Sequence, residues 1–225
     1  MGYIREAVFM GGNAKNCLNT DIYAITSEEH SLGRGNIYVV EQLIKAGIKI
    51  IQYREKEKKK LYKFRECKII REMTKNSGVT FIVNDDVDIA LAIGADGVHI
   101  GQEDLPIEEV RKIVGDEMII GLSTHSPVQA IDAVKKGADY IGVGPIFPTK
   151  TKKDVCDPVG FEYLECVVKN INIPFVAIGG IKEHNIKEVQ KRGATCFAMI
   201  TELVGAKDII TKVKAIRKRL AKVNM

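Results

Sequence analysis

The feature that most constrains the fold of this chain is a junction that recurs along it, in which a glycine precedes a short apolar run. The junction occurs at Lys45-Ala46-Gly47-Ile48, Ile93-Gly94-Ala95-Asp96, Lys136-Gly137-Ala138-Asp139 and Arg192-Gly193-Ala194-Thr195. At each of them a helix is predicted to end at a left-handed glycine, after which a buried strand begins. The intervals between the junctions each fit two strand–helix units of about 20 to 25 residues. Strand and helix are therefore expected to alternate along the chain.

Eight apolar runs are the candidate strands. They are near-continuous rather than alternating, which is typical of parallel strands covered on both faces. Amphipathic segments such as Leu61–Lys75, Pro127–Lys136 and His184–Arg192 are the candidate helices, and Pro106 and Pro127 fit first helical turns. The candidate strands are Ile22–Thr26, Ile48–Tyr53, Thr80–Asn84, Gly97–Ile100, Met118–Leu122, Tyr140–Gly144, Phe175–Ile178 and Cys196–Ile200.

Eight such alternations in 225 residues leave no room for a second domain. We therefore predict an α/β protein with a single-domain (βα)8 TIM barrel over residues 21–225 and a short N-terminal extension, residues 1–20. A doubly wound open sheet is the alternative fold.

Composition excludes several classes of protein. The net charge is +5, with basic and acidic residues interspersed, no tryptophan and no interleaving of basic with aromatic residues, so no nucleic-acid partner is expected. There is no apolar run of transmembrane length, no secretory signal pattern, and an odd number of cysteines, five, without C-x-x-C spacing. We expect a cytoplasmic protein with reduced cysteines and no membrane partner. A homo-oligomer is compatible with these features.

Polar residues follow nearly every predicted strand. In a (βα)8 barrel the active site lies at the carboxyl ends of the strands, so these residues are expected to converge. They are Gln52-Tyr53-Arg54-Glu55-Lys56, Asn84-Asp85-Asp86, His99-Ile100-Gly101-Gln102-Glu103-Asp104, Ser123-Thr124-His125, Gly179-Gly180 and Ile200-Thr201.

The sixth strand leads into a segment, residues 144–153, with two prolines, two threonines and three lysines. Prolines stiffen the chain, and hydroxyls alternating with ammonium groups suit phosphate or diphosphate oxygens. A solvated basic loop is the alternative for the segment taken alone. Its place after a barrel strand favours a binding loop.

Two carboxylates, Asp85 and Asp104, follow neighbouring strands and can meet at one cation. Magnesium takes one or two carboxylates and completes its shell with water and phosphate oxygens. Taken alone, Asp85 could instead cap the next helix, although Asp86 is the more natural cap. Gly179-Gly180 and Ile200-Thr201 stand where many barrels bind a phosphate with backbone N–H groups. Two anion sites are therefore predicted.

The histidines and the lysine run are less specific. His99 can point into the site or be a packed structural residue, and His125 has the stronger case because it adjoins Ser123 and Thr124. His30 and His184 are expected on the surface. The run Lys58-Lys59-Lys60 is expected to be a solvated helix start. No Ser/His/Asp triad or covalent nucleophile is recognised.

In combination these segments resemble the thiamine-phosphate synthase family over roughly residues 22–205. The resemblance rests on six motifs in order: Gln52-x-Arg54-x-Lys56, Asn84-Asp85-Asp86, His99-x-Gly101-Gln102-x-Asp104, Gly121-x-Ser123-Thr124-His125, Gly144-Pro145-Ile146-Phe147-Pro148-Thr149-x-Thr151-Lys152 and Ile178-Gly179-Gly180-Ile181. It implies an enzyme, a transferase that joins hydroxymethylpyrimidine diphosphate to a thiazole phosphate or its carboxylated form. The products would be thiamine phosphate and pyrophosphate.

The resemblance also implies roles for individual residues. Asp85 and Asp104 would hold Mg²⁺, and Gln52 and Ser123 would hydrogen-bond the aminopyrimidine. Arg54, Lys56, Ser123 and Lys152 are the predicted catalytic residues. Tyr53 and Glu55 complete the predicted substrate-binding set. The diphosphate would be bound by Arg54, Lys56, Asn84 and Lys152, and the thiazole phosphate by Thr149, Lys150, Thr151, Gly180, Ile200 and Thr201.

The chain departs from the family pattern at Thr201, where serine is frequent, and at Glu202, where a small residue is common. Glu202 would place a carboxylate near a phosphate. Two alternative functions stay open: a thiazole tautomerase, which shares the barrel and the phosphate site, and a non-catalytic barrel that binds a phosphorylated ligand. The cations and metal carboxylates favour the synthase.

Overall fold

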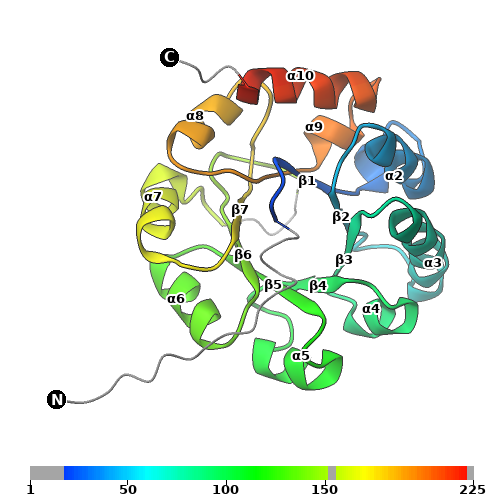
Figure 1. The fold of residues 1–225 in the computed structure, drawn as a ribbon, viewed down its shortest axis with the longest axis horizontal. Coiled ribbons are helices and arrows are strands. Elements are labelled where there is room, and N and C mark those ends of the chain that lie inside the picture. Colours follow the sequence, from blue (N-terminus) through cyan, green and yellow to red (C-terminus); the bar gives the residue numbers. More distant parts are fainter. Residues whose placement is uncertain (1–17, 152–155, 222–225) are drawn as a thin grey trace.

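The structure is a computed structural model, and it describes residues 18–151 and 156–221. Eight parallel strands close into a barrel in the order β1 to β8, and a ring of helices surrounds it (Figure 1). The predicted (βα)8 fold is confirmed, and the open-sheet alternative is wrong because β1 pairs with β8. The strands are β1 Ile22–Ile25, β2 Ile50–Tyr53, β3 Thr80–Asn84, β4 Gly97–Ile100, β5 Ile119–Thr124, β6 Tyr140–Val143, β7 Phe175–Ala177 and β8 Phe197–Met199.

The helices connect successive strands and bury their apolar faces against the barrel. The predicted C-terminal glycines are confirmed, since Gly47, Gly94, Gly137 and Gly193 all have φ between 61° and 96°. The helices are η1 Glu28–His30, α2 Asn36–Lys45, α3 Lys60–Asn76, α4 Val87–Ile93, α5 Ile107–Val114, α6 Pro127–Lys135, α7 Gly160–Asn170, α8 Ile186–Lys191, α9 Thr201–Val204 and α10 Ile209–Ala221.

Prolines lie at the starts of two helices, α5 and α6. Pro127 is in the first turn of α6, behind Ser126, whose Oγ accepts from the Gln129 N–H, as expected for a capped start. Pro106 is the N-cap of α5 and not part of its first turn, so that prediction is off by one residue. Its extended ψ of 145° keeps it outside the helix.

The predicted N-terminal extension, residues 1–20, lies almost wholly outside the described residues, and its boundary stays a prediction. Within residues 18–151 and 156–221, no helix is long and apolar enough to cross a membrane. No disulfide joins the cysteines of this part of the chain.

Candidate active site

A cavity of about 460 Å³ opens at the carboxyl ends of the strands. It is lined by the segments that follow β5, β6, β7 and β8. All the described residues that were assigned to the thiazole phosphate lie on it: Thr149, Lys150, Thr151, Gly180, Ile200 and Thr201. The sequence therefore predicted which side chains gather at one wall of the site.

The β6–α7 segment is fastened to the end of β7. Ile146 N–H donates to Ile178 O at 2.9 Å, and Phe147 N–H donates to Gly179 O at 3.0 Å. Gly180 has φ +62°, and a Cβ there would lie 2.7 Å from Pro148 O, so this position requires glycine. The predicted glycine pair therefore serves to bring two loops together at the cavity wall.

The two threonines of this segment are hydrogen-bonded to one another. Thr149 Oγ1 accepts from the Thr151 N–H at 3.3 Å and lies 3.1 Å from Thr151 Oγ1. Both are half-buried and line the cavity, whereas Lys150 is exposed at its edge. Lys152, the predicted catalytic cation of the same segment, lies outside the described residues.

The short helix α9 begins at Thr201, directly after β8, and borders the cavity. Glu202, the residue that departs from the family pattern, also lines the cavity. Its Oε1 lies 3.2 Å from Lys212 Nζ, which also pairs with Glu183 at 3.0 Å. The hydrogen bonds to Glu183 and Glu202 raise the pKa of Lys212 despite some burial. Glu202 is thus ion-paired with a lysine from α10, which it shares with Glu183.

Besides Lys150, the cavity is bordered by two histidines and a second lysine. His30, expected on the surface, is half-buried, bonds Ser27 Oγ at 2.9 Å and lines the cavity, so that prediction is wrong. His125 lines it too, with Nδ1 2.6 Å from Gly144 O. Lys182 was missed, because its position after the Gly179-Gly180 turn carries no motif. His184 is exposed, as expected.

A second, smaller cavity of about 20 Å³ lies deeper, inside the barrel. Ser123, Gly142, Ile178 and Ala198 line both cavities, so the two are contiguous. Gln52, Arg54, Asn84 and His99 line the deeper one, together with two tyrosines, Tyr23 and Tyr140, that the sequence analysis did not select. An aromatic residue inside a strand resembles ordinary core, and this is why they were missed.

Arg54 is the cation of the deeper cavity. Its Nε is buried and has no hydrogen-bond partner within the described residues. Burial lowers the pKa of Arg54, opposed by the carboxylates of Asp85 and Glu55. A buried guanidinium N–H without a partner costs stability unless a ligand binds it, and guanidinium suits phosphate oxygens. The arrangement favours an anion beside Arg54.

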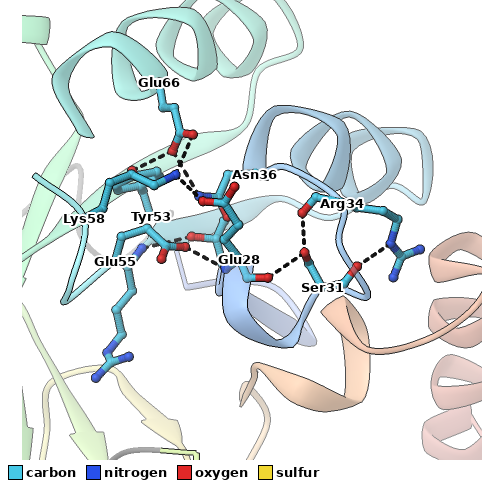
Figure 2. Close-up of polar contacts among 10 residues, drawn as sticks. Glu28, Ser31, Arg34, Asn36, Tyr53, Glu55, Lys58 and Glu66 are labelled. Atoms are coloured by element: carbon cyan, nitrogen blue, oxygen red, sulfur yellow. Dashed lines mark hydrogen bonds and ion pairs between the residues drawn. The ribbon is translucent and has the colours of Figure 1, made fainter. Parts of the chain in front are cut away.

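The neighbouring residues Tyr53 and Glu55 face other protein groups (Figure 2). Tyr53 is buried behind the barrel wall, and its OH donates to Glu66 at 2.7 Å; burial and this bond raise its pKa. Glu55 accepts from the Glu28 N–H at 2.8 Å. Neither lines a cavity, because side chains alternate along a strand and only Gln52 and Arg54 point inward. We therefore remove Tyr53 and Glu55 from the residues proposed to contact substrate.

Lys58 lies between the carboxylates of Glu28 and Glu66, as Figure 2 shows, and only 18% of its side chain is exposed. The prediction that the lysine run is a solvated helix start is wrong for Lys58 and right for Lys59 and Lys60, which are exposed at the start of α3. The pair with Glu28 fastens the segment that carries Arg54 and Lys56 to the loop after β1, and the pair with Glu66 fastens it to α3.

Asp85 and Asp104 come together beside the deeper cavity. Burial raises the pKa of Asp85, and the nearby Asp104 carboxylate raises it further, against the ion pair with Lys56. Asp104 Oδ2 accepts from the Gly101 N–H at 2.7 Å. Asp85 has φ +60°, one of two positive values for non-glycine residues in the described part. Two mutually repelling carboxylates with a neighbouring cavity form a donor set that fits a magnesium ion.

Asp86 is the N-cap of α4 by position, as expected, but its carboxylate does not cap the helix. It pairs with Lys63 at 2.8 Å instead. Within residues 18–151 and 156–221 no three His, Cys, Asp or Glu side chains cluster as a metal site. A cation here would therefore depend on two carboxylates and on ligand oxygens.

Comparisons with known proteins agree with this geometry. The family model described as thiamine monophosphate synthase matches residues 22–203. A thiamine-phosphate synthase from Pelotomaculum thermopropionicum is 70% identical over 200 residues, which cover 89% of this chain and 92% of that protein. One from Lawsonia intracellularis is 54% identical over 203 residues, covering 90% and 94%. The solved thiamine phosphate pyrophosphorylase from Pyrococcus furiosus superposes with a TM-score of 0.84 at 36% identity, covering 95% of this chain and all of that one.

Proposed function

The chain belongs to the thiamine monophosphate synthase family and is a transferase, and on this premise we propose that it joins hydroxymethylpyrimidine diphosphate to a thiazole phosphate. The products would be thiamine phosphate and pyrophosphate. One observation carries the proposal: two contiguous cavities share the mouth of the barrel, each with groups suited to an anion. A reaction between two phosphorylated molecules needs two such places side by side.

We assign the deeper cavity to the pyrimidine and the metal pair to its diphosphate. Arg54, Lys56 and Asn84 would bind diphosphate oxygens, together with Lys152 from the segment outside the described residues. Asp85 and Asp104 would hold a magnesium ion, which supplies positive charge to the diphosphate when bound. Gln52 and Ser123 would orient the ring. The thiazole phosphate would lie in the larger cavity, against Thr149, Lys150, Thr151, Gly180, Ile200 and Thr201.

The proposed chemistry is a dissociative substitution. The bond between the pyrimidine methylene carbon and the diphosphate oxygen breaks, and its electron pair leaves with pyrophosphate. The thiazole nitrogen then donates its lone pair to that carbon and forms the new bond. The residues therefore stabilise charge on the leaving group, and no covalent nucleophile is required. The tautomerase alternative would leave the buried Arg54 and the paired carboxylates without a role, and a non-catalytic phosphate-binding barrel would not need the paired carboxylates.

The direct test uses purified full-length protein with Mg²⁺ and both phosphorylated substrates. We expect equal amounts of pyrophosphate and thiamine phosphate, measured by a coupled phosphate assay and by chromatography. Omitting the thiazole phosphate is the control, and chelation of Mg²⁺ should abolish turnover. Folded protein that forms no thiamine phosphate would contradict the proposed function. The same assay with the carboxylated thiazole would establish which form is preferred.

Lys212 offers a test of whether the charge of Glu202 affects binding of the thiazole phosphate in the larger cavity. Replacing Lys212 by methionine leaves the Glu202 carboxylate uncompensated at the cavity, so we expect KM for the thiazole phosphate to rise by about fivefold at low salt. The double variant Glu202→Gln/Lys212→Met should return KM close to the wild-type value. Lys112→Met, which removes an exposed lysine paired with Glu109 on α5, is the matched control. If the double variant is as impaired as Lys212→Met, charge balance is not the cause.

The cellular setting follows as part of the same proposal. Both substrates are small phosphorylated molecules, and we propose that the enzyme acts on them in the cytoplasm. Neither a nucleic acid nor a membrane has a part in the proposed reaction. A homo-oligomer stays a prediction, which light scattering of the purified protein would test.

A further inference from the structure

A chain of hydrogen bonds crosses the barrel interior and ends at the two residues proposed to orient the pyrimidine. Gln52 Nε2 donates to Tyr23 OH at 3.0 Å, and Tyr23 OH lies 2.7 Å from Tyr140 OH. Tyr140 OH lies 3.0 Å from His99 Nδ1, and His99 Nε2 lies 2.9 Å from Ser123 Oγ. Each side chain comes from a different strand. The proposed reaction assigns no role to the three central members.

Gly121 leaves the space that this series of hydrogen bonds needs. His99, Gly121 and Tyr140 are register partners across β4, β5 and β6, so their side chains would point to the same face. A Cβ at Gly121 would lie 2.1 Å from the Tyr140 ring, so only glycine leaves room for the phenol to reach His99. Tyr23 and Tyr140 are 2% and 1% exposed. Buried polar groups that hydrogen-bond one another are held in a fixed arrangement.

The donor at one end sets the direction of the whole chain. With the Gln52 amide donating to Tyr23, the Tyr23 hydroxyl keeps its own proton, and its 2.7 Å contact with Tyr140 OH can take that proton as a hydrogen bond. The Tyr140 proton then goes to His99 Nδ1, and the proton on His99 Nε2 goes to Ser123 Oγ. Ser123 is left with its own proton directed into the cavity. The Gln52 amide oxygen is left as an acceptor.

If the hydrogen bonds ran in the reverse direction, Ser123 and Gln52 would exchange their donor and acceptor roles toward the ligand. Ser123 would donate to His99 Nε2, His99 Nδ1–H would donate to Tyr140, and the hydroxyl protons would run back to the Gln52 oxygen. Ser123 would then present only lone pairs to a ligand, and Gln52 only N–H groups. The two directions therefore differ in the histidine tautomer and in which end of the site donates.

We propose that Tyr23, Tyr140 and His99 are positioning residues that fix Ser123 as a hydrogen-bond donor and the Gln52 oxygen as an acceptor toward the ligand. This inference rests on the proposed function. An aminopyrimidine presents ring nitrogens that accept and an amino group that donates, which is the complement of such a site. A pyrimidine with a carbonyl in place of the amino group presents an N–H and an oxygen there, and it meets mismatched partners.

The first test reads the direction without any substrate. The chain has four histidines, so protein labelled with 15N-histidine gives few ring signals, and those of His99 are identified by their loss in His99→Gln. We expect the Nε2–H tautomer in the wild-type protein, with Nδ1 shifted as an acceptor. In Tyr140→Phe the Nδ1 signal should move toward the position of an unbonded ring nitrogen. An Nδ1–H tautomer in the wild type would overturn the proposal.

The second test reads the consequence for selectivity. We expect Tyr140→Phe to raise KM for hydroxymethylpyrimidine diphosphate by about five- to tenfold and to lower discrimination against the carbonyl analogue by a similar factor, while KM for the thiazole phosphate is unchanged. Tyr163→Phe is the matched control, because its buried OH bonds Thr124 Oγ1 at 2.6 Å outside the barrel. Unchanged discrimination in Tyr140→Phe would overturn the proposal. Wild-type protein without synthase activity would instead contradict the proposed function, and the tautomer measurement would still decide the direction.

Discussion

Replacing Asp104 by asparagine is expected to lower the turnover number of the synthase reaction by about 100- to 1000-fold. The substitution removes one of the two carboxylates proposed to hold magnesium, while its remaining oxygen can still accept from the Gly101 N–H. The loop after β4 should therefore keep its shape. Thiazole phosphate binding, measured by calorimetry, should be unchanged because Asp104 does not line the larger cavity.

Asp88→Asn is the matched control, since Asp88 is an exposed carboxylate on α4 paired with Lys60 at 2.8 Å. It should leave turnover unchanged at saturating Mg²⁺. If Asp104→Asn retains wild-type turnover and the same dependence on Mg²⁺ concentration, the proposed metal pair is wrong. Asp85→Asn should show a loss of the same order.

Asp104→Asn should also make the metal-free protein slightly more stable. Burial and Asp104 raise the pKa of Asp85, so the folded protein holds this proton more tightly than the unfolded chain does. Stability is then lost as pH rises from the unfolded pKa through the folded one. Removing the Asp104 charge relieves part of that loss, and we expect Tm at pH 7 with chelator to rise by roughly 1–2 °C. The gain should vanish at a pH below the unfolded pKa of Asp85.

The fold was predictable from the sequence because barrel strands are buried on both faces. Each candidate strand overlaps an observed one, with ends that differ by up to two residues, since apolar runs such as Ile48–Tyr53 continue into the turn before the strand. The left-handed glycines Gly47, Gly94, Gly137 and Gly193 marked where α2, α4, α6 and α8 end. Closure into a barrel followed from the count of units, because eight parallel units in this length favour closure over an open sheet.

The site was predictable only where a residue type alone indicates chemistry. Thr149 and Gly180 line the larger cavity because, in addition to being residue types that suit an anion, they lie in segments that follow barrel strands. Tyr53 and Glu55 line neither cavity, because adjacent residues of a strand end point to opposite sides of the barrel wall. Tyr23 and Tyr140 were missed because a tyrosine in a buried strand resembles core. The usable signal was Gly121, a glycine inside a strand that indicates close approach of a large side chain.

Replacing Arg54 should cause the second large loss of synthase activity. Its guanidinium is buried beside the deeper cavity, and Nε lacks a partner within the described residues, so a bound diphosphate would complete its hydrogen bonds. We expect Arg54→Met to lower kcat/KM for hydroxymethylpyrimidine diphosphate by about 100- to 1000-fold, with KM for the thiazole phosphate unchanged. Arg54→Lys keeps the charge but loses the planar fork, so it should recover only part of the activity.

Arg71→Lys is the control that separates an effect on stability from an effect on substrate binding and turnover. It binds both oxygens of Asp96 at 2.8 and 2.9 Å, at the opposite end of the barrel, where Asp96 also accepts from the Phe81 N–H. Arg71→Lys should therefore lower Tm and leave kcat/KM for both substrates unchanged. The reverse pattern is expected for Arg54→Lys, because its side chain supports a ligand rather than the fold. If Arg54→Lys and Arg54→Met were equally active, and both close to wild type, the diphosphate would have to bind elsewhere, and the division of the site into two anion subsites would fail with it.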